Sequence, residues 1–347
     1  MYLNRRAAAL SAVAVATMSA LGGCGADADE QTDDDNSDNS IVLYSGRDEE
    51  LVGPIIDAFT QESGIEVEVR PGDTTELAAQ LLEEGDSTQA DVFLSQDAGA
   101  LGALAEAGAF ATLPDDVAGA VPAAFTSTDD TWVGVTGRAR VFAYDPRDVE
   151  ESELPETVQG FVDPRWSGEV AVAPTNASFQ AFVTALRVSE GEDVAEEFLS
   201  GLVDNDVQIY ESNGDILAAI EDGQVDVGLI NHYYKYELAA EVGAENVITE
   251  LKFAEPGTAG ALVNVSGAGI LAGAEGDEDA EELVRYLVSE EAQTAFAEQT
   301  FEYPLVEGVP GPEGLPELSE LVGGDFDLAR LESLDETTAL IQSVGLV

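Results

Sequence analysis

Short apolar runs alternate along this chain with longer stretches in which apolar residues recur every third or fourth position. The short runs are typical of strands and the longer spacing of amphipathic helices. Such alternation favours parallel strands, whose crossover connections are supplied by helices, so we expect an α/β fold. The expected strands are 41–44, 65–69, 92–94, 132–136, 141–144, 170–173, 207–210 and 227–230, and the expected helices are 49–63, 74–84, 97–107, 178–188, 214–221, 277–289 and 290–299.

The N-terminus lacks this alternation. Arg5 and Arg6 precede a small apolar run, 7–21, that is shorter than the roughly 20 residues of a transmembrane helix and is typical of a secretory signal. Leu-Gly-Gly-Cys at 21–24 resembles a bacterial lipobox, which implies cleavage before Cys24 and lipid attachment to its thiol. We therefore expect a signal peptide at 1–23 and a mature chain held on the outer face of the cell membrane by its lipid alone.

The predicted mature chain begins with a polar segment, 24–40, that is rich in Asp, Asn, Ser and Thr. It holds too few apolar residues to order itself, so we expect a flexible acidic linker. Cys24 is the only cysteine, so no disulfide can form within one chain and a core must stabilise the fold. The roughly 300 residues that follow are enough for two domains.

Acidic residues dominate the composition. Asp and Glu number 70 against 13 Lys and Arg, which gives a net charge of −57; since 1–23 holds Arg5, Arg6 and no acid, its removal gives −59. Nucleic acid and anionic lipid would repel this surface, so we expect neither as a partner. A salt-rich habitat would screen the self-repulsion, because the Debye length falls to about 3 Å at 1 M salt. A generally acidic secreted proteome is the alternative explanation.

Two adjacent tyrosines, Tyr233 and Tyr234, follow the apolar run 227–230. Open α/β sheets bind ligands beyond the carboxyl ends of their strands, so this pair would aim two phenol oxygens into such a crevice. Phenolate is a hard anionic donor, and a trivalent cation could hold two phenols deprotonated far below their ordinary pKa of about 10. The alternative is packing by two amphipathic rings.

Seven blocks, in unbroken order, resemble the ferric-ion-binding members of the periplasmic binding proteins that serve ABC importers. The blocks are 41–50 (IVLYSGRDEE), 59–65 (FTQESGI), 90–96 (ADVFLSQ), 137–141 (GRARV), 164–168 (PRWSG), 174–178 (PTNAS) and 229–234 (LINHYY). The resemblance implies a two-lobed type II fold, each lobe a mixed sheet flanked by helices, joined by crossover hinge strands. It further implies a monomer that works with the permease and ATPase of an iron importer.

The resemblance also places the lobes. Lobe 1 would comprise 41–138 and 265–308, and lobe 2 would comprise 139–264 and 309–347. The chain would cross between them near 136–141, near 263–267 and near 309. The Gly-rich stretch 266–269 is consistent with backbone that moves or packs closely.

For the metal, the resemblance implies that Tyr233 and Tyr234 bind Fe3+ as phenolates. Asp48 stands where the family often has His, and Asp48 or the following Glu49 would offer a carboxylate. The alternative for both is a first-turn acid favoured by the helix dipole. Gln96 stands where some members have Glu and would contribute a hydrogen bond at most. Water or an anion would then complete the coordination sphere.

An anion such as phosphate or carbonate would, by the resemblance, lie among Asn176, Ala177, Ser178, Asn213 and Asn231. Helix N-termini offer free N–H groups for this role, although Asn176 and Asn213 could equally be ordinary N-caps.

Three arginines lie near these blocks in the sequence. We expect Arg47, Arg138 and Arg140 to form salt bridges within this acidic chain, with Arg140 as a candidate cleft residue. The alternative is that one of the three pairs with the anion. His232 is the only histidine. It is not expected to bind the metal, because three consecutive helical residues cannot easily face one ion.

The sequence therefore predicts a lipid-anchored receptor that binds ferric iron between two lobes. The alternative is the same fold holding a phosphonate, thiosulfate or polyamine, which the departures at Asp48 and Gln96 leave open. We do not expect an enzyme, because one His and one lipidated Cys form no evident arrangement of nucleophile and base.

Overall fold

The computed structural model describes residues 39–322 and 328–347. The predicted signal peptide, Cys24 and nearly all of the predicted linker lie outside the described residues. The strands are β1 (Ser40–Ser45), β2 (Glu66–Pro71), β3 (Val92–Ser95), β4 (Val133–Tyr144), β5 (Val170–Val172), β6 (Gln208–Ile209), β7 (Val227–Asn231), β8 (Glu250–Lys252), β9 (Val263–Ile270) and β10 (Tyr303–Pro304). The helices are α1 (Glu49–Ser63), α2 (Thr74–Glu84), α3 (Ala98–Glu106), α4 (Asp115–Ala118), α5 (Ala177–Glu190), α6 (Glu192–Asp204), α7 (Asn213–Glu221), α8 (Tyr233–Val242), α9 (Glu278–Leu287), α10 (Glu290–Gln299), α11 (Leu318–Leu321), α12 (Leu334–Ser343) and the 3-10 helix η9 (Leu328–Glu332).

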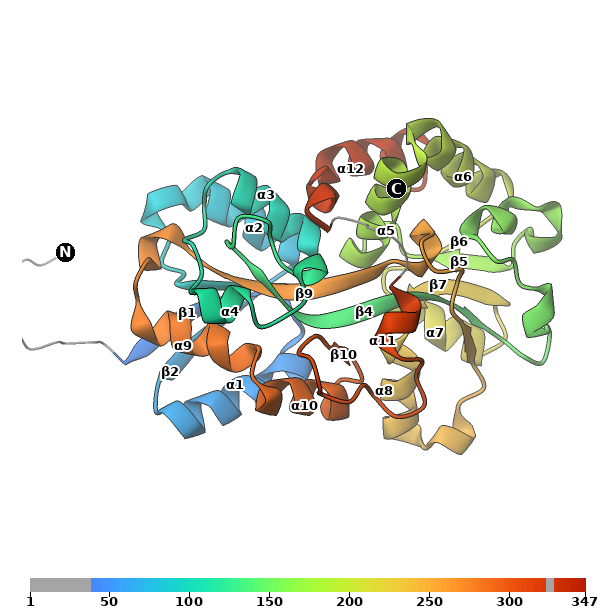
Figure 1. Ribbon diagram of the computed structural model, residues 1–347. Helices are drawn as coiled ribbons and strands as arrows, with labels where there is room; N and C mark the ends of the chain where they lie inside the picture. The colour runs from blue at the N-terminus through green and yellow to red at the C-terminus, as the bar shows by residue number, and fades with distance from the viewer. Residues whose placement is uncertain (1–38, 323–327) are drawn as a thin grey trace, which may run out of the picture. The chain divides into compact units, whose positions relative to one another are not determined.

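The strands join in the order β2-β1-β3-β9-β4-β7-β5-β6, with β10 and β8 also paired to β4. β1 pairs in parallel with β2 and β3, and β5 pairs in parallel with β6 and β7. β9 and β4 run antiparallel to their neighbours and cross the middle of the molecule (Figure 1). We call the part from β2 to β9, with β10, the first half-sheet, and the part from β7 to β6, with β8, the second half-sheet.

β4 belongs to both half-sheets. Its stretch from Val133 to Ala139 pairs with β9, and its stretch from Arg140 to Tyr144 pairs with β7. The prediction of two separate strands, 132–136 and 141–144, is therefore wrong. The polar sequence between them suggested a break, yet all twelve residues of β4 are buried. Both of its arginines are buried: Arg138 lies near the Glu302 carboxylate, and Arg140 donates to the Ser178 hydroxyl and the Leu229 carbonyl.

The Gly-rich stretch 266–269 lies inside β9. A Cβ on Gly267 would come within 2.7 Å of both the Val133 carbonyl oxygen and Leu101, so this backbone packs closely. The sequence prediction omitted β9 as a strand because small residues weaken the apolar signal. It also omitted α6, where Ala195, Phe198, Leu199 and Leu202 form a buried stripe at helical spacing.

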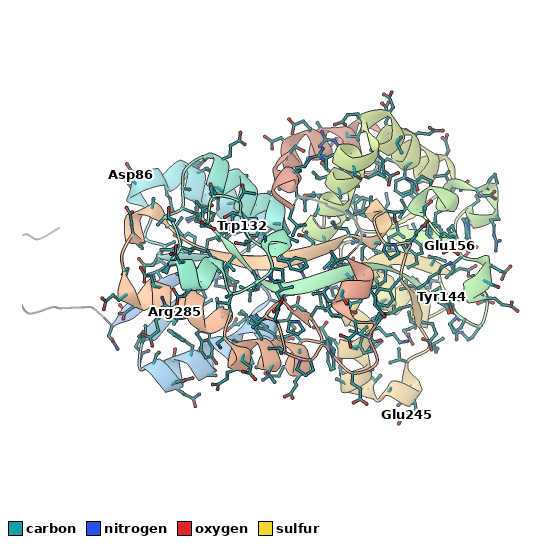
Figure 2. All side chains as sticks on the ribbon, viewed as in Figure 1. Asp86, Trp132, Tyr144, Glu156, Glu245 and Arg285 are labelled. Atoms are coloured by element: carbon teal, nitrogen blue, oxygen red, sulfur yellow. The ribbon has the colours of Figure 1, made fainter. Side chains whose placement is uncertain are left out.

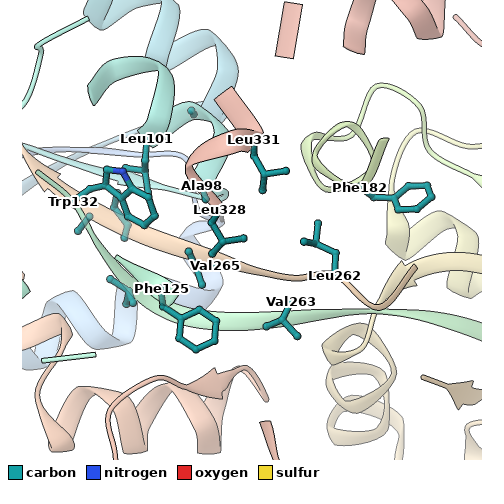
Figure 3. Packing of buried hydrophobic residues seen from close by; sticks show 14 of the residues in the cluster. Ala98, Leu101, Phe125, Trp132, Phe182, Leu262, Val263, Val265, Leu328 and Leu331 are labelled. Carbon is teal, nitrogen blue, oxygen red and sulfur yellow. The ribbon is translucent and has the colours of Figure 1, made fainter. Parts of the chain in front are cut away.

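Helices cover both faces of the half-sheets. In Figure 1, α2 and α3 lie above the first half-sheet with α1, α9 and α10 below it, and α5 and α6 lie above the second with α7 and α8 below it. The C-terminal segment follows the upper side, where η9 packs against α3 and α12 packs against α5. Leu328 and Leu331 of η9 lie beside Ala98 and Leu101 (Figure 3).

Acidic residues are spread over the surface of the protein. Asp86, Glu156 and Glu245 are exposed on different sides of the molecule (Figure 2). Within the described ranges, no helix combines the length and the hydrophobicity needed to cross a bilayer. The predicted lobe boundaries stay a prediction, although two of the three predicted crossing segments, near 136–141 and 263–267, fall in the central strands β4 and β9.

Candidate metal-binding cleft

The predicted site residues follow the carboxyl ends of parallel strands. Asp48 and Glu49 follow β1, Gln96 follows β3, and Tyr233 and Tyr234 follow β7. Asn176 follows β5, and Asn213 follows β6. This is the edge at which open α/β sheets bind ligands, because the loops and helix N-termini converge there. The alternation of strands and helices therefore brings together residues that are distant in the sequence.

The tyrosine pair starts α8 and is held firmly. The side chains of Tyr233 and Tyr234 stack with ring centroids 4.4 Å apart and planes 24° apart. Tyr233 is 1% exposed, and its hydroxyl has no hydrogen-bond partner among residues 39–322 and 328–347. Burial raises the pKa of Tyr233 well above its ordinary value and also raises the pKa of Tyr234. Both phenols are consequently protonated unless a strong positive charge displaces the proton.

Both tyrosines line a cleft of about 1030 Å³ whose other walls come from α1, α7 and the end of α10. Its described lining includes seven acids and no Lys or Arg. The acids are Asp48, Glu49, Glu50, Glu221, Asp222, Glu237 and Glu241. Such a surface attracts cations, because charges of one sign in a concave site reinforce each other.

The first-turn acids of α1 are placed differently from the tyrosines. Asp48, Glu49 and Glu50 are exposed, and the Asp48 side chain caps no backbone N–H of the helix. No group of three or more His, Cys, Asp or Glu side chains in the described structure is arranged to hold a metal ion. The structure thus places Asp48 and Glu49 on the same cleft as the tyrosines without drawing them into a preformed cluster.

A second cavity, of about 490 Å³, adjoins the first. It is lined by Asp48, Glu49 and Tyr234, and also by Gln96 and Asn176. Turns from the two half-sheets therefore face each other here, and Tyr234 lies between the two cavities. The backbone N–H of Gln96 donates to Thr74 Oγ1 at 3.0 Å, which fixes the turn that carries its amide.

Behind these cavities lies a buried polar network that contains most of the predicted anion residues. The Ser178 hydroxyl donates to Asn176 Oδ1 at 2.6 Å and accepts from Asn213 Nδ2 at 3.1 Å and from Arg140 Nη1 at 3.3 Å. Among the residues described, Asn213 Oδ1 and Asn231 Nδ2 lack partners. The N-cap alternative is confirmed for Asn176, which accepts from the Ser178 N–H, and it is wrong for Asn213, because Ser212 caps α7.

The buried arginines differ in how their charge is balanced. Arg47 bonds Glu302 at 2.8 Å, and Arg138 lies 3.9 Å from the same carboxylate, so salt bridges are confirmed for these two. The expectation is wrong for Arg140, which forms no salt bridge with any residue in the described ranges. It donates instead to the Leu229 carbonyl at 2.6 Å, and its guanidinium lies over the rings of Phe179 and Phe182.

The pKa of Arg140 reflects this lack of a carboxylate partner in the described structure. Burial lowers this pKa to about 9, because the surroundings compensate only part of the lost hydration of the guanidinium. The uncharged network of Asn and Ser around it can solvate the guanidinium only in part. An anion is the natural counter-charge for such a group.

His232 has a structural role in the described protein. Its Nδ1 accepts from the Ala139 N–H at 3.1 Å, and its Nε2 lies 2.9 Å from the Phe301 carbonyl oxygen, to which it donates. Burial lowers its pKa to about 4, so the ring is neutral. Since both nitrogens are engaged, the ring joins β4, α8 and the end of α10.

The family model for bacterial extracellular solute-binding proteins matches residues 87–325 of this chain. The chain belongs to this family. It is 33% identical over 311 residues to the major ferric iron-binding protein of Neisseria meningitidis serogroup B, covering 88% of this chain and 93% of that protein.

Solved structures agree with this membership. Iron-bound HitA from Pseudomonas aeruginosa is 34% identical with a TM-score of 0.84, covering 88% of this chain and 99% of that one. The Trichodesmium protein IdiA (FutA), solved with iron and citrate, is 28% identical with a TM-score of 0.74 and covers 88% of this chain and 99% of that one. The predicted family and the predicted α/β fold of the type II binding proteins are therefore confirmed.

Two acids that the structure places at or near the site of this solute-binding protein were not identified from the sequence. Glu302 is fully buried and accepts from Arg47, Thr136 and Thr300, and nothing in its local sequence indicates this. Glu237 lines the cleft beside the tyrosines, and burial raises its pKa to about 7. Its position four residues after Tyr233 was a usable signal, because that spacing places both on one helix face.

Proposed function

We propose that this protein is a lipid-anchored extracytoplasmic receptor that binds ferric iron in the cleft and delivers it to an ABC importer. The observation that carries the proposal is the hydroxyl of Tyr233, which is buried and lacks a partner among the described residues at the wall of an acid-lined cleft. A buried donor without a partner is costly to the fold. Binding a hard cation as phenolate removes that cost.

The charge of the ion matters for this role. Burial raises the pKa of Tyr233 and of Tyr234, so an ion must supply enough electrostatic energy to remove both protons near neutral pH. A trivalent ion does so more readily than a divalent one, because the interaction scales with its charge. Asp48 and Glu49, on the facing wall, would add carboxylate donors from α1.

An anion would complete the coordination in this proposal. The network of Arg140, Ser178, Asn213 and Asn231 adjoins the second cavity through Asn176, and it holds a cation with no carboxylate partner in the described structure. Phosphate, carbonate or citrate could supply the missing negative charge and an oxygen for the ion. Ala177 is the first residue of α5, and its side chain offers the anion no hydrogen bond.

Delivery and anchoring extend the same proposal. A receptor of this fold exchanges its ligand through motion of two lobes, which we place as 41–138 with 265–308 and 139–264 with 309–347. The permease and ATPase of an iron importer would receive the ion from a monomeric protein. Lipid on Cys24 and the acidic linker 24–40 would keep the protein beside that importer, and no catalytic step is assigned to it.

A polyamine is the second candidate ligand, and the cleft itself favours it. Seven acids together with Tyr233, Tyr234 and Phe301 are found among the described lining residues, and several carboxylates with aromatic rings are what a polycation requires. Most of these acids are exposed at the rim, however, where ion pairs contribute little. The buried phenol is better explained by a metal ion.

One preparation tests these alternatives. The protein purified from membranes is analysed by native mass spectrometry and elemental analysis, then titrated with chelated ferric iron, spermidine, thiosulfate and a phosphonate. We expect lipid on an N-terminal Cys24, bound iron, and an orange to red phenolate-to-iron colour that fades on acidification as protons compete for the ligands. A colourless protein that binds spermidine or an anion instead would refute the iron receptor.

A further inference from the structure

Glu237 lies one helical turn after the tyrosine pair on α8. It is three residues beyond Tyr234 and four beyond Tyr233, so the three side chains share one face of the helix. All three line the same cleft. Glu237 Oε1 is buried and, like the Tyr233 hydroxyl, has no hydrogen-bond partner in the described ranges 39–322 and 328–347.

Two positive charges that could balance Glu237 are already paired with other acids. Arg47 is bonded to Glu302 at 2.8 Å, and Lys235, on the same helix, is bonded to Glu250. A carboxylate oxygen removed from water without a partner destabilises the fold unless a cation compensates it. Glu237 therefore has the chemistry of a ligand whose partner comes from outside the chain.

The charge of a ferric ion calls for such a ligand. Two phenolates leave one positive charge, which one carboxylate would neutralise. Asp48 and Glu49 are exposed and lie at the start of α1, whereas Glu237 lies on the helix that carries both phenols. We propose that Glu237 is a third anionic ligand of the bound ferric ion, an inference that rests on the proposed function.

This arrangement would gather three anionic donors on α8 alone. The ion could then be captured by one helix before α1 contributes anything, and Asp48 and Glu49 would act only when they approach the bound ion. Donors on one rigid helix need no rearrangement relative to each other, which lowers the entropic cost of binding. Affinity should accordingly depend more on Glu237 than on either acid of α1.

The test compares Glu237→Gln with Glu245→Gln, which removes one exposed acid from the 3-10 helix Ala244–Asn246 outside the cleft lining. Ferric affinity is measured by competition with citrate, and the phenolate-to-iron absorption band is recorded for each protein. We expect Glu237→Gln to bind about 10- to 100-fold more weakly, in the range found for lost metal-site interactions. Its band should move to longer wavelength, because a weaker donor leaves the iron a better electron acceptor.

The outcomes separate this inference from the proposed function. A wild-type protein without ferric binding refutes the function itself. A wild type that binds, with Glu237→Gln matching Glu245→Gln in affinity and band position, refutes the ligand role of Glu237 alone. Thermal unfolding of the apo proteins checks folding. If Glu237→Gln does not fold, Glu237→Ala carries the test, because it also removes the carboxylate, and an unchanged affinity and band in that variant overturn the inference.

Discussion

Two walls of the cleft differ in how firmly the structure fixes their side chains. The α8 wall (Tyr233, Tyr234 and Glu237) holds a stacked ring pair and buried polar atoms. The α1 wall (Asp48, Glu49 and Glu50) is exposed, and Asp48 makes no capping bond. Both walls start helices that follow parallel strands, so topology alone does not distinguish them.

The difference teaches where binding energy can be concentrated. A buried group without a partner gains from a ligand the full energy that desolvation cost it, because solvent does not compete. An exposed carboxylate exchanges one hydrated state for another and is screened by salt beyond about 8–10 Å. We therefore assign affinity to the α8 wall and attraction of the cation to the α1 wall.

Removing the phenol oxygens should give the largest effect. Tyr233→Phe and Tyr234→Phe keep the ring packing while each deletes one donor, so we expect each to lower ferric affinity by more than about 100-fold, since even supporting residues around a metal contribute 10–100-fold. The double variant should lose binding and colour together. Competition titration and the visible spectrum measure both.

Tyr286→Phe on α9 is the matched control, because it removes a phenol oxygen from outside the cleft lining. The melting temperature of each apo variant should stay close to that of the wild type. Single Phe variants that bind as well as Tyr286→Phe would show that the stacked pair is packing, and the contrast between the two walls would lose its basis.

The buried network behind the α8 wall should give an intermediate effect that depends on the buffer. Asn213→Leu removes the donor to Ser178 and leaves the phenols in place. We expect about 10-fold weaker ferric binding in phosphate or bicarbonate, corresponding to one lost buried hydrogen bond, and little change in a buffer without either anion. Isothermal titration in the two buffers measures the difference.

Asn246→Leu, at an exposed position, controls for the change in side-chain character. Equal weakening of Asn213→Leu in both buffers would assign Asn213 to packing at the start of α7. The anion would then have to lie elsewhere in the cleft.

The α1 wall should give the smallest effect. Asp48→Asn combined with Glu49→Gln removes two exposed charges, and we expect a loss of about threefold in affinity at low salt that disappears near 1 M salt. Ferric titration across salt concentrations provides the measurement, with Glu245→Gln and Asp86→Asn combined as the control. A salt-independent loss as large as that of a Phe variant would show that Asp48 or Glu49 contributes as much affinity as a phenol, and the distinction between the walls would be lost.

Local patterns in the sequence predicted most elements of the fold. Helices α1, α2 and α10 have the predicted bounds, because their apolar spacing and flanking residues are unambiguous. The sequence prediction split β4 into two strands, because a segment that contains Arg138 and Arg140 lacks the apolar pattern of a buried strand. Its burial depends on partners more than 35 residues away, such as Ser178 and Glu302, which no local window contains.

For the candidate site too, local features could be predicted from the sequence and features that depend on distant partners could not. The tyrosine pair and the strand-end positions could be identified from sequence and family resemblance. The lack of an acid partner for Arg140 in the described structure, and the buried oxygen of Glu237, could not. Both depend on which side chains the fold excludes from water, and this is a property of packing between distant segments.

The continuity of β4 has a consequence for how the protein comes apart. Each half-sheet uses part of this one buried strand as an interior member, between β9 and β10 in the first half-sheet and between β7 and β8 in the second. Loss of either half-sheet would expose β4 residues of the other and leave their backbone groups unpaired. We therefore expect the two half-sheets to melt as one cooperative unit, and we expect neither to fold as an isolated fragment.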